Sequence, residues 1–232
     1  APSENGCGCN YPDYVDSEVV ACSNAIMREL QSIAADAPDI CRALEVLPMV
    51  RTIQVGDARI GIVHGDAEAL AGWAFAAECL GSDGRCEVFD TVAIEPTPIV
   101  KIATIFREAK VCAFASTHTC LPHARDFDVE GTARLVINNG AAGMPNFARS
   151  TFGVITRISI DPAVPRDSLY GIEIGGVRFD ALPVHYDQHA WIDAFLHNWH
   201  PGSPAHASYF ERIMNGPLFA LSNAIGGRVR PA

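Results

Sequence analysis

The sequence predicts a mixed α/β fold in which layers of β-sheet are flanked by helices, and three observations lead to this prediction. Hydrophobic residues make up 49% of the 232 residues and charged residues 19%, which is enough apolar side chain for a packed core. Short β-branched and aromatic runs, bounded by Gly, Pro, Asn or Asp, recur along the chain. Between them lie longer segments with helical spacing of apolar residues. Because these helices and strands do not alternate regularly, we expect a mixed layered sandwich and not a regular parallel sheet.

The predicted helices follow from apolar residues that recur every three or four positions. Five segments show this spacing: residues 16–35, 39–47, 67–80, 98–109 and 208–221. Ser17 and Glu18 are suitable residues to begin the first helix, and Pro48 stops the second. The segment at 67–80 is rich in alanine, and Gly216-Pro217 interrupts the last.

The predicted strands are short and rich in Val, Ile and Phe. They cover residues 51–55, 59–64, 111–115, 134–138 and 152–160, with two more strands within 170–179. A tight turn at Gly56-Asp57 joins the first two strands into a hairpin, and Gly175-Gly176 separates the last two. The order of elements therefore indicates two sheets rather than a repeated βαβ unit.

Charge and cysteine content limit the classes of function. A formal net charge of −10 argues against an electrostatic nucleic-acid binder, but not against a phosphate ester as substrate, because bound metal ions can reverse the local field. No apolar run approaches the roughly 20 residues of a membrane span. The eight cysteines are scattered along a long chain, so we expect a reducing, cytoplasmic setting. Cys7, Cys9 and Cys22 leave a zinc site or a disulfide open, although Cys-x-Cys is not a usual zinc spacing.

Two predicted strands end in residues that can bind metal. One strand reads Ile-Gly-Ile-Val and continues into His64, Gly65 and Asp66, and another leads to His118 and Cys120. Ligands bind at strand ends in layered α/β folds, and imidazole and thiolate are good ligands for first-row transition metals. The sequence therefore predicts His64, His118 and Cys120 as candidate metal ligands; ordinary hydrogen-bonded histidines are the alternative.

A third strand runs into a loop of Asn, Gly and Pro at residues 138–146. A tight turn that needs positive backbone angles would explain this composition. Glycine also lets the backbone approach a ligand closely. Gly65, Asp66, Asn139 and Gly140 are therefore the candidate residues for a substrate loop, and Asp66 is also a candidate to orient a histidine ring.

Taken in order, these three motifs resemble the C-terminal signature of the calcineurin-like metallophosphoesterases. That signature has a strand ending in His-Gly, a strand ending in a Gly-His-Thr-His-like tetrad with a nearby Pro, and a strand leading into an Asn-Gly-x-x-Gly-x-Pro loop. The matching residues here are His64-Gly65, residues 117–120 with Pro122, and residues 139–145. The resemblance covers about residues 50–160 and implies a layered metallophosphoesterase-like β-sandwich flanked by helices.

The resemblance also implies site roles and an activity. His64 and His118 would share one metal ion of a dinuclear centre, and Cys120 stands where the family has a histidine on the other ion. Two divalent ions (Mn, Fe, Zn or Mg) would activate water against a small phosphorylated substrate, a phosphate mono- or diester. Thr117 and Cys120 depart from the family pattern, so a non-catalytic domain that keeps the fold and binds a ligand or partner is the alternative.

The family's upstream motifs, Asp-x-His, Gly-Asp-x-x-Asp and Gly-Asn-His, do not occur before His64. We therefore expect a fold that is incomplete at its N-terminus, in a chain that starts inside a longer protein and is inactive alone. Residues 1–183 would be the C-terminal portion of the domain, with residues 1–48 as a helical insertion, and residues 184–232 an appendage. An open sheet edge would then favour association, so an oligomer is left open.

Overall fold

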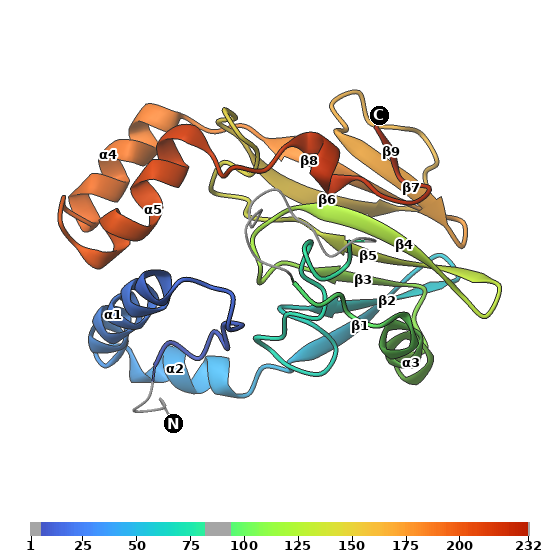
Figure 1. Ribbon diagram of the computed structural model, residues 1–232, viewed down its shortest axis with the longest axis horizontal. Helices are drawn as coiled ribbons and strands as arrows, with labels where there is room; N and C mark the ends of the chain where they lie inside the picture. Colours follow the sequence, from blue (N-terminus) through green and yellow to red (C-terminus); the bar gives the residue numbers. More distant parts are fainter. Residues whose placement is uncertain (1–5, 82–93, 232) are drawn as a thin grey trace.

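The computed structural model describes residues 6–81 and 94–231 and confirms the predicted mixed α/β class. Two sheets lie one above the other, with α3 covering the outer face of the larger one (Figure 1). One sheet has five strands and is mixed, and the other has four strands and is antiparallel. This is the layered arrangement that the sequence predicts.

The five-stranded sheet places three parallel strands side by side. Its order is β1 (Val50–Val55), β2 (Ala58–Val63), β3 (Ala113–Ser116), β5 (Thr132–Asn138) and β4 (His123–Val129). β2, β3 and β5 run parallel, while β1 and β4 pair antiparallel at the two sides. The carboxyl ends of the three parallel strands therefore meet at one edge of the sheet. The β1–β2 hairpin is confirmed, with its turn at Gly56-Asp57.

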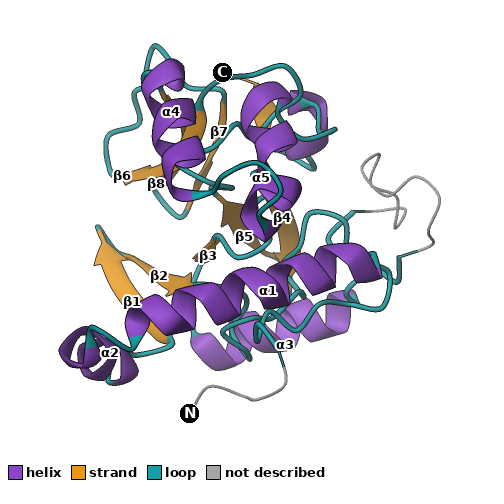
Figure 2. Ribbon diagram, turned by 90° about the vertical axis from the view of Figure 1, so that its left-hand side faces the viewer, coloured by secondary structure: helices purple, strands orange, loops and turns teal. Residues whose placement is uncertain are grey.

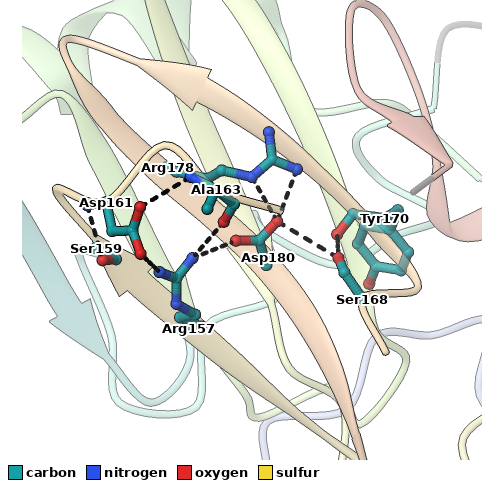
Figure 3. Close-up of polar contacts among 8 residues, drawn as sticks. All are labelled: Arg157, Ser159, Asp161, Ala163, Ser168, Tyr170, Arg178 and Asp180. Carbon is teal, nitrogen blue, oxygen red and sulfur yellow. Dashed lines mark hydrogen bonds and ion pairs between the residues drawn. The ribbon is translucent and has the colours of Figure 1, made fainter. Parts of the chain in front are cut away.

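The four-stranded sheet has the order β6 (Gly153–Ser159), β8 (Val177–Val184), β7 (Tyr170–Ile174) and β9 (Arg230–Pro231). Its inner face contributes Tyr170 and Phe179 to the core between the sheets. The opposite face carries a buried carboxylate, Asp180, between the guanidinium groups of Arg157 and Arg178 (Figure 3). Successive side chains of a strand point to opposite faces of the sheet. Phe179 therefore points into the core, and the next residue, Asp180, points to the opposite face.

The described residues form five α-helices, α1 (Ser17–Ala34), α2 (Pro38–Glu45), α3 (Ile99–Ala109), α4 (Gln188–Asn198) and α5 (Pro204–Asn215), of which all but α3 gather beyond one end of the sheets (Figure 1). The helices predicted at 16–35, 39–47 and 98–109 are confirmed, and the one predicted at 208–221 begins at Pro204 and ends before Gly216. α5 packs against α1, so the C-terminal tail contacts the N-terminal helix (Figure 2). The division at residue 183 stays a prediction.

The helix predicted at residues 67–80 is wrong, because this segment forms a series of turns. The carboxylate of Asp66 accepts hydrogen bonds from the backbone N–H groups of Glu68, Ala69 and Ala74, at 2.9–3.1 Å. A Cβ on Gly72 would overlap that carboxylate. These contacts satisfy the backbone outside a helix and override the helical preference of alanine. The strand β4 and the helix α4 were not predicted.

Two apolar clusters hold the layers together. One lies between the sheets and includes Ile60, Leu135 and Phe179, and the other joins the larger sheet to α3 through Phe114 and Phe106. β1 ends the strand order of the larger sheet among the described strands; an edge left open by missing strands, and association through it, stay predictions. No helix of the described segments has the length and apolar character needed to cross a bilayer.

Candidate functional site

The ends of β2 and β3 bring His64 and His118 together. The carbonyl oxygen of His64 accepts hydrogen bonds from the backbone N–H groups of Thr117, at 3.1 Å, and His118, at 2.8 Å. These bonds continue the parallel pairing of the two strands beyond their last residues. Nε2 of His64 then lies 3.1 Å from Nδ1 of His118, and the ring centroids are 4.9 Å apart. Convergence of the two imidazoles, which the strand-end argument predicts, is therefore present.

The spacing of the two ring nitrogens fits a shared metal ion. Two nitrogens bound at about 2.0–2.1 Å to one ion lie roughly 2.9–3.4 Å apart for angles between octahedral and tetrahedral. The 3.1 Å between Nε2 of His64 and Nδ1 of His118 falls in that range. A direct hydrogen bond between the rings has the same length. Within residues 6–81 and 94–231, no three His, Cys, Asp or Glu side chains are grouped so that they could hold a metal ion.

The second nitrogen of His118 faces the N-terminal loop. Its Nε2 lies 3.3 Å from the carbonyl oxygen of Cys9, and this same oxygen accepts a hydrogen bond from Nε1 of Trp73 at 3.0 Å. The indole of Trp73 meets the His118 ring edge-on, with centroids 5.4 Å apart. Burial lowers the pKa of His118 below its ordinary value, the Cys9 carbonyl opposes this, and the nearby His64 adds to it. A neutral ring is the form that binds metal.

Cys120 does not join the two histidines in one group of possible ligands among the described side chains. Its Sγ lies 3.4 Å from the carbonyl oxygen of His118, and its backbone takes a left-handed conformation with φ of 56°. Burial raises the pKa of this thiol, while the positive charge of Arg212 lowers it. Arg212, on α5, donates to the carbonyl oxygen of Cys120 at 2.7 Å, so the C-terminal tail helps to fix this turn.

Gly65 and Asp66 form the first part of the loop that follows β2. A Cβ on Gly65 would overlap the backbone of Gly72, so the close approach of two loop segments requires glycine here. Asp66 is buried, at 5% exposure, and its carboxylate accepts hydrogen bonds from backbone N–H groups of its own loop. This carboxylate therefore shapes the loop; contact of Gly65 or Asp66 with a substrate stays a prediction.

The loop after β5 lies beside the turn that carries His118. The backbone N–H of Asn139 donates to the carbonyl oxygen of Ser116 at 3.2 Å, and the Thr117 hydroxyl donates to the carbonyl oxygen of Gly140 at 2.9 Å. Gly140 has φ of 64°, and a Cβ there would overlap the side chain of Asn146. The turn interpretation of this glycine is therefore confirmed, and its place next to the imidazole pair keeps it a candidate substrate residue.

Three further residues at the site were not predicted. Cys9 takes part through its backbone carbonyl, for which a sequence gives no signal. Trp73 lies within the segment for which the sequence predicts a helix, and the glycine before it, Gly72, is the local sign of a turn. Arg212 lies on a tail helix far along the chain, and only packing brings it to the site.

The cysteines of the N-terminal region, Cys7, Cys9 and Cys22, are free thiols. The backbone N–H of Cys9 lies 3.4 Å from Sγ of Cys7, so the first two lie close together without a bond between them. Burial raises the pKa of Cys9 to about 11. The structure thus shows neither the disulfide nor, among its described residues, a ligand set for the zinc site that the sequence left open.

The chain matches no protein-family model and no curated protein. Its shape is similar to a hypothetical protein, PH1004, from Pyrococcus horikoshii OT3, at 13% identity and a TM-score of 0.47, over 90% of this chain and 63% of that one. A metallophosphoesterase from Sphaerobacter thermophilus is similar at 16% identity and 0.37, over 68% and 56%. Wild-type Vps29 from Entamoeba histolytica, in complex with Zn²⁺, is similar at 15% identity and 0.28, over 60% and 62%.

This chain therefore spans about 56–63% of the length of these three structures. All three TM-scores lie below 0.5, so these structures assign no function to this chain.

Proposed function

We propose that His64 and His118 bind one divalent cation and that the complete protein is a metal-dependent hydrolase of small phosphate mono- or diesters. The observation that supports this most directly is the 3.1 Å between Nε2 of His64 and Nδ1 of His118, at adjoining ends of two parallel strands. The order of the three sequence motifs supports the same reaction class.

In this proposal the residues of the chain have distinct roles. A dinuclear metal centre, when bound, would lower the pKa of a water molecule, and its positive charge would stabilise the negative charge of the phosphate. Neutral imidazoles at His64 and His118 hold a cation without adding negative charge, which keeps the site attractive to an anionic substrate in an acidic chain. The loop with Asn139 and Gly140 borders the place where a phosphate would lie. A ligand role for Cys120 on the second ion stays a prediction.

The proposal requires further ligands, since two histidines do not complete a dinuclear centre. The carboxylate motifs of the resembling family do not occur in the sequence before His64. The source of the bridging carboxylates is therefore part of the proposal that the complete protein must test. The identity of the metal, the cytoplasmic setting and the oligomeric state stay predictions.

Metal titration of the chain tests the ligand assignment. Isothermal titration calorimetry with Zn²⁺ is expected to show binding that His64→Ala and His118→Ala each weaken at least about 10-fold. His197→Ala is the matched control, because His197 is an exposed histidine on α4. Equal affinity in His64→Ala and in the control would refute the assignment. In the complete protein, Mn²⁺-stimulated hydrolysis of a chromogenic phosphodiester should be lost in His64→Ala.

A non-catalytic binding domain is the second candidate function. The observation that favours it is the lack, among the described residues, of a third side chain grouped with the two histidines. In that case Zn²⁺ still binds with the same dependence on His64 and His118. Phosphodiester hydrolysis by the complete protein then stays at the background rate with every divalent metal tried, which separates the two candidates.

A further inference from the structure

The N-terminal loop before α1 is fixed at two points on that helix. The backbone N–H of Cys7 donates to the side-chain oxygen of Asn24 at 2.7 Å. The hydroxyl groups of Tyr11 and Ser23 lie 2.9 Å apart and share a hydrogen bond. Both partners, Ser23 and Asn24, lie on α1. The segment between these anchors therefore has a defined course over the site.

Cys9 lies between the two anchors and presents its carbonyl oxygen to the site. Nε1 of Trp73 donates to this oxygen at 3.0 Å, and Nε2 of His118 lies 3.3 Å from it. The Trp73 ring contacts the Tyr11 ring, with centroids 5.6 Å apart, and meets the His118 ring in a T-shaped arrangement. The carbonyl oxygen is thus held in place by a donor that is independent of the histidine.

A carbonyl oxygen can only accept a hydrogen bond. Nε2 of His118 can therefore bond to it only when Nε2 carries the hydrogen. In the neutral ring, Nδ1 then has a free lone pair, and this is the nitrogen that lies 3.1 Å from Nε2 of His64. Metal-bound histidines commonly donate their other ring N–H to a carboxylate or a backbone carbonyl, which fixes the tautomer and the ring orientation.

We propose that the Cys9 carbonyl, held by the Trp73 indole, is a positioning group that fixes His118 in the tautomer protonated at Nε2 and aims Nδ1 toward His64. The expected effect on metal affinity rests on the proposed function above, whereas the tautomer is a property of the chain itself. Trp73 acts here through Cys9 and His118 and is a positioning residue, not a catalytic one.

Nitrogen-15 NMR of the histidine rings tests the proposal on the chain without metal. At pH 8 an imidazole with an ordinary pKa near 6.5 is neutral. The nitrogen-15 chemical shifts of its two ring nitrogens then show which of them carries the hydrogen. His118 is expected as the form protonated at Nε2. Trp73→Phe keeps an aromatic ring but removes the N–H that holds the Cys9 carbonyl, so the His118 signals should move toward a mixture of tautomers. The affinity for Zn²⁺ should fall about 10-fold in the same variant.

Two further variants make the test specific. Asn24→Ala releases the Cys7 anchor at a distance from the rings, and it should shift the His118 tautomer in the same direction as Trp73→Phe. Trp191→Phe is the matched control, because Trp191 lies on α4 with 37% exposure, and it should leave both readouts unchanged.

The outcomes separate this inference from the metal proposal. An Nδ1-protonated His118 in the unaltered chain, or a tautomer unchanged in both Trp73→Phe and Asn24→Ala, would overturn the positioning role whether or not Zn²⁺ binds. An Nε2-protonated ring that both variants disturb, in a chain that binds no Zn²⁺, would support the positioning role and refute the metal proposal alone.

Discussion

Asp180 offers the sharpest test of how the smaller sheet is stabilised. Its side chain is fully buried on the face of the sheet that points away from the core (Figure 3). Oδ2 accepts from Nη1 of Arg157 at 2.9 Å, and Oδ1 accepts from Nε and Nη2 of Arg178 at 2.8 Å each. The arginine side chains are only 24% and 14% exposed, so both depend on this carboxylate for compensation of charge. Ser168 adds a longer contact, at 3.4 Å.

Replacing Asp180 by alanine should therefore destabilise the fold strongly. Removing one partner of a buried ion pair costs about 3–5 kcal/mol. Both arginines reach solvent in part, and Arg157 keeps a second carboxylate, Asp161, at 3.5 Å, so we expect the lower value, about 3 kcal/mol. For a chain of this size, this loss lowers the melting temperature by about 6–12 °C.

Urea unfolding followed by circular dichroism measures the loss, with Asp161→Ala as control. The Asp161 side chain is 62% exposed, and an exposed ion pair contributes only about 0–1 kcal/mol. A cost below about 1 kcal/mol for Asp180→Ala, or one equal to that of the control, would show that the arginines find other partners or water and that the reasoning is wrong.

Three more predictions concern the site and the core. Gly65→Ala should weaken Zn²⁺ binding, because a Cβ would overlap the Gly72 backbone and displace the turn after His64; unchanged affinity would contradict this. Burial lowers the pKa of His123 to about 3, whereas the unfolded residue takes up a proton below about 6.5. As the pH is lowered from about 6.5 to about 3, the free energy of unfolding should therefore decrease, by up to about 1.4 kcal/mol per pH unit. In urea titrations, His123→Gln should lose this pH dependence, while the control His197→Gln should keep it. Burial raises the pKa of Cys79 to about 11, so native alkylation by iodoacetamide at pH 8, followed by peptide mass spectrometry, should be roughly 100-fold slower than for free cysteine; rapid native labelling would contradict this.

Elements that depend on local chemistry were predictable from the sequence. The hairpin of β1 and β2 follows from two β-rich runs around Gly56-Asp57, and α1 follows from its apolar spacing. The meeting of His64 and His118 was also predictable in outline, since both residues follow strands that lie side by side and parallel. Apolar periodicity and turn composition depend on residues that are close in the chain. The elements that they predict therefore form when the tertiary packing is consistent with them.

Elements that depend on distant partners were not predictable. The segment after Asp66 has the composition of a helix, but three backbone hydrogen bonds to one carboxylate hold it in turns. The sequence of β4 contains charged residues that interrupt the apolar pattern expected of a strand, and the strand forms by pairing with β5. Cys120 follows the same strand as His118, and its turn has a left-handed backbone conformation and a hydrogen bond from Arg212 of α5, neither of which the local sequence indicates.

The sequence by itself determined the layered α/β class, the strand-end histidines and the glycines that let their loops turn. Only the tertiary structure decided which nitrogen of His118 faces His64, because that choice depends on a carbonyl oxygen 109 residues earlier in the chain and on the indole that holds it. Residue types fix which chemical groups are available, whereas the direction of a lone pair is set by packing between segments that are far apart in sequence.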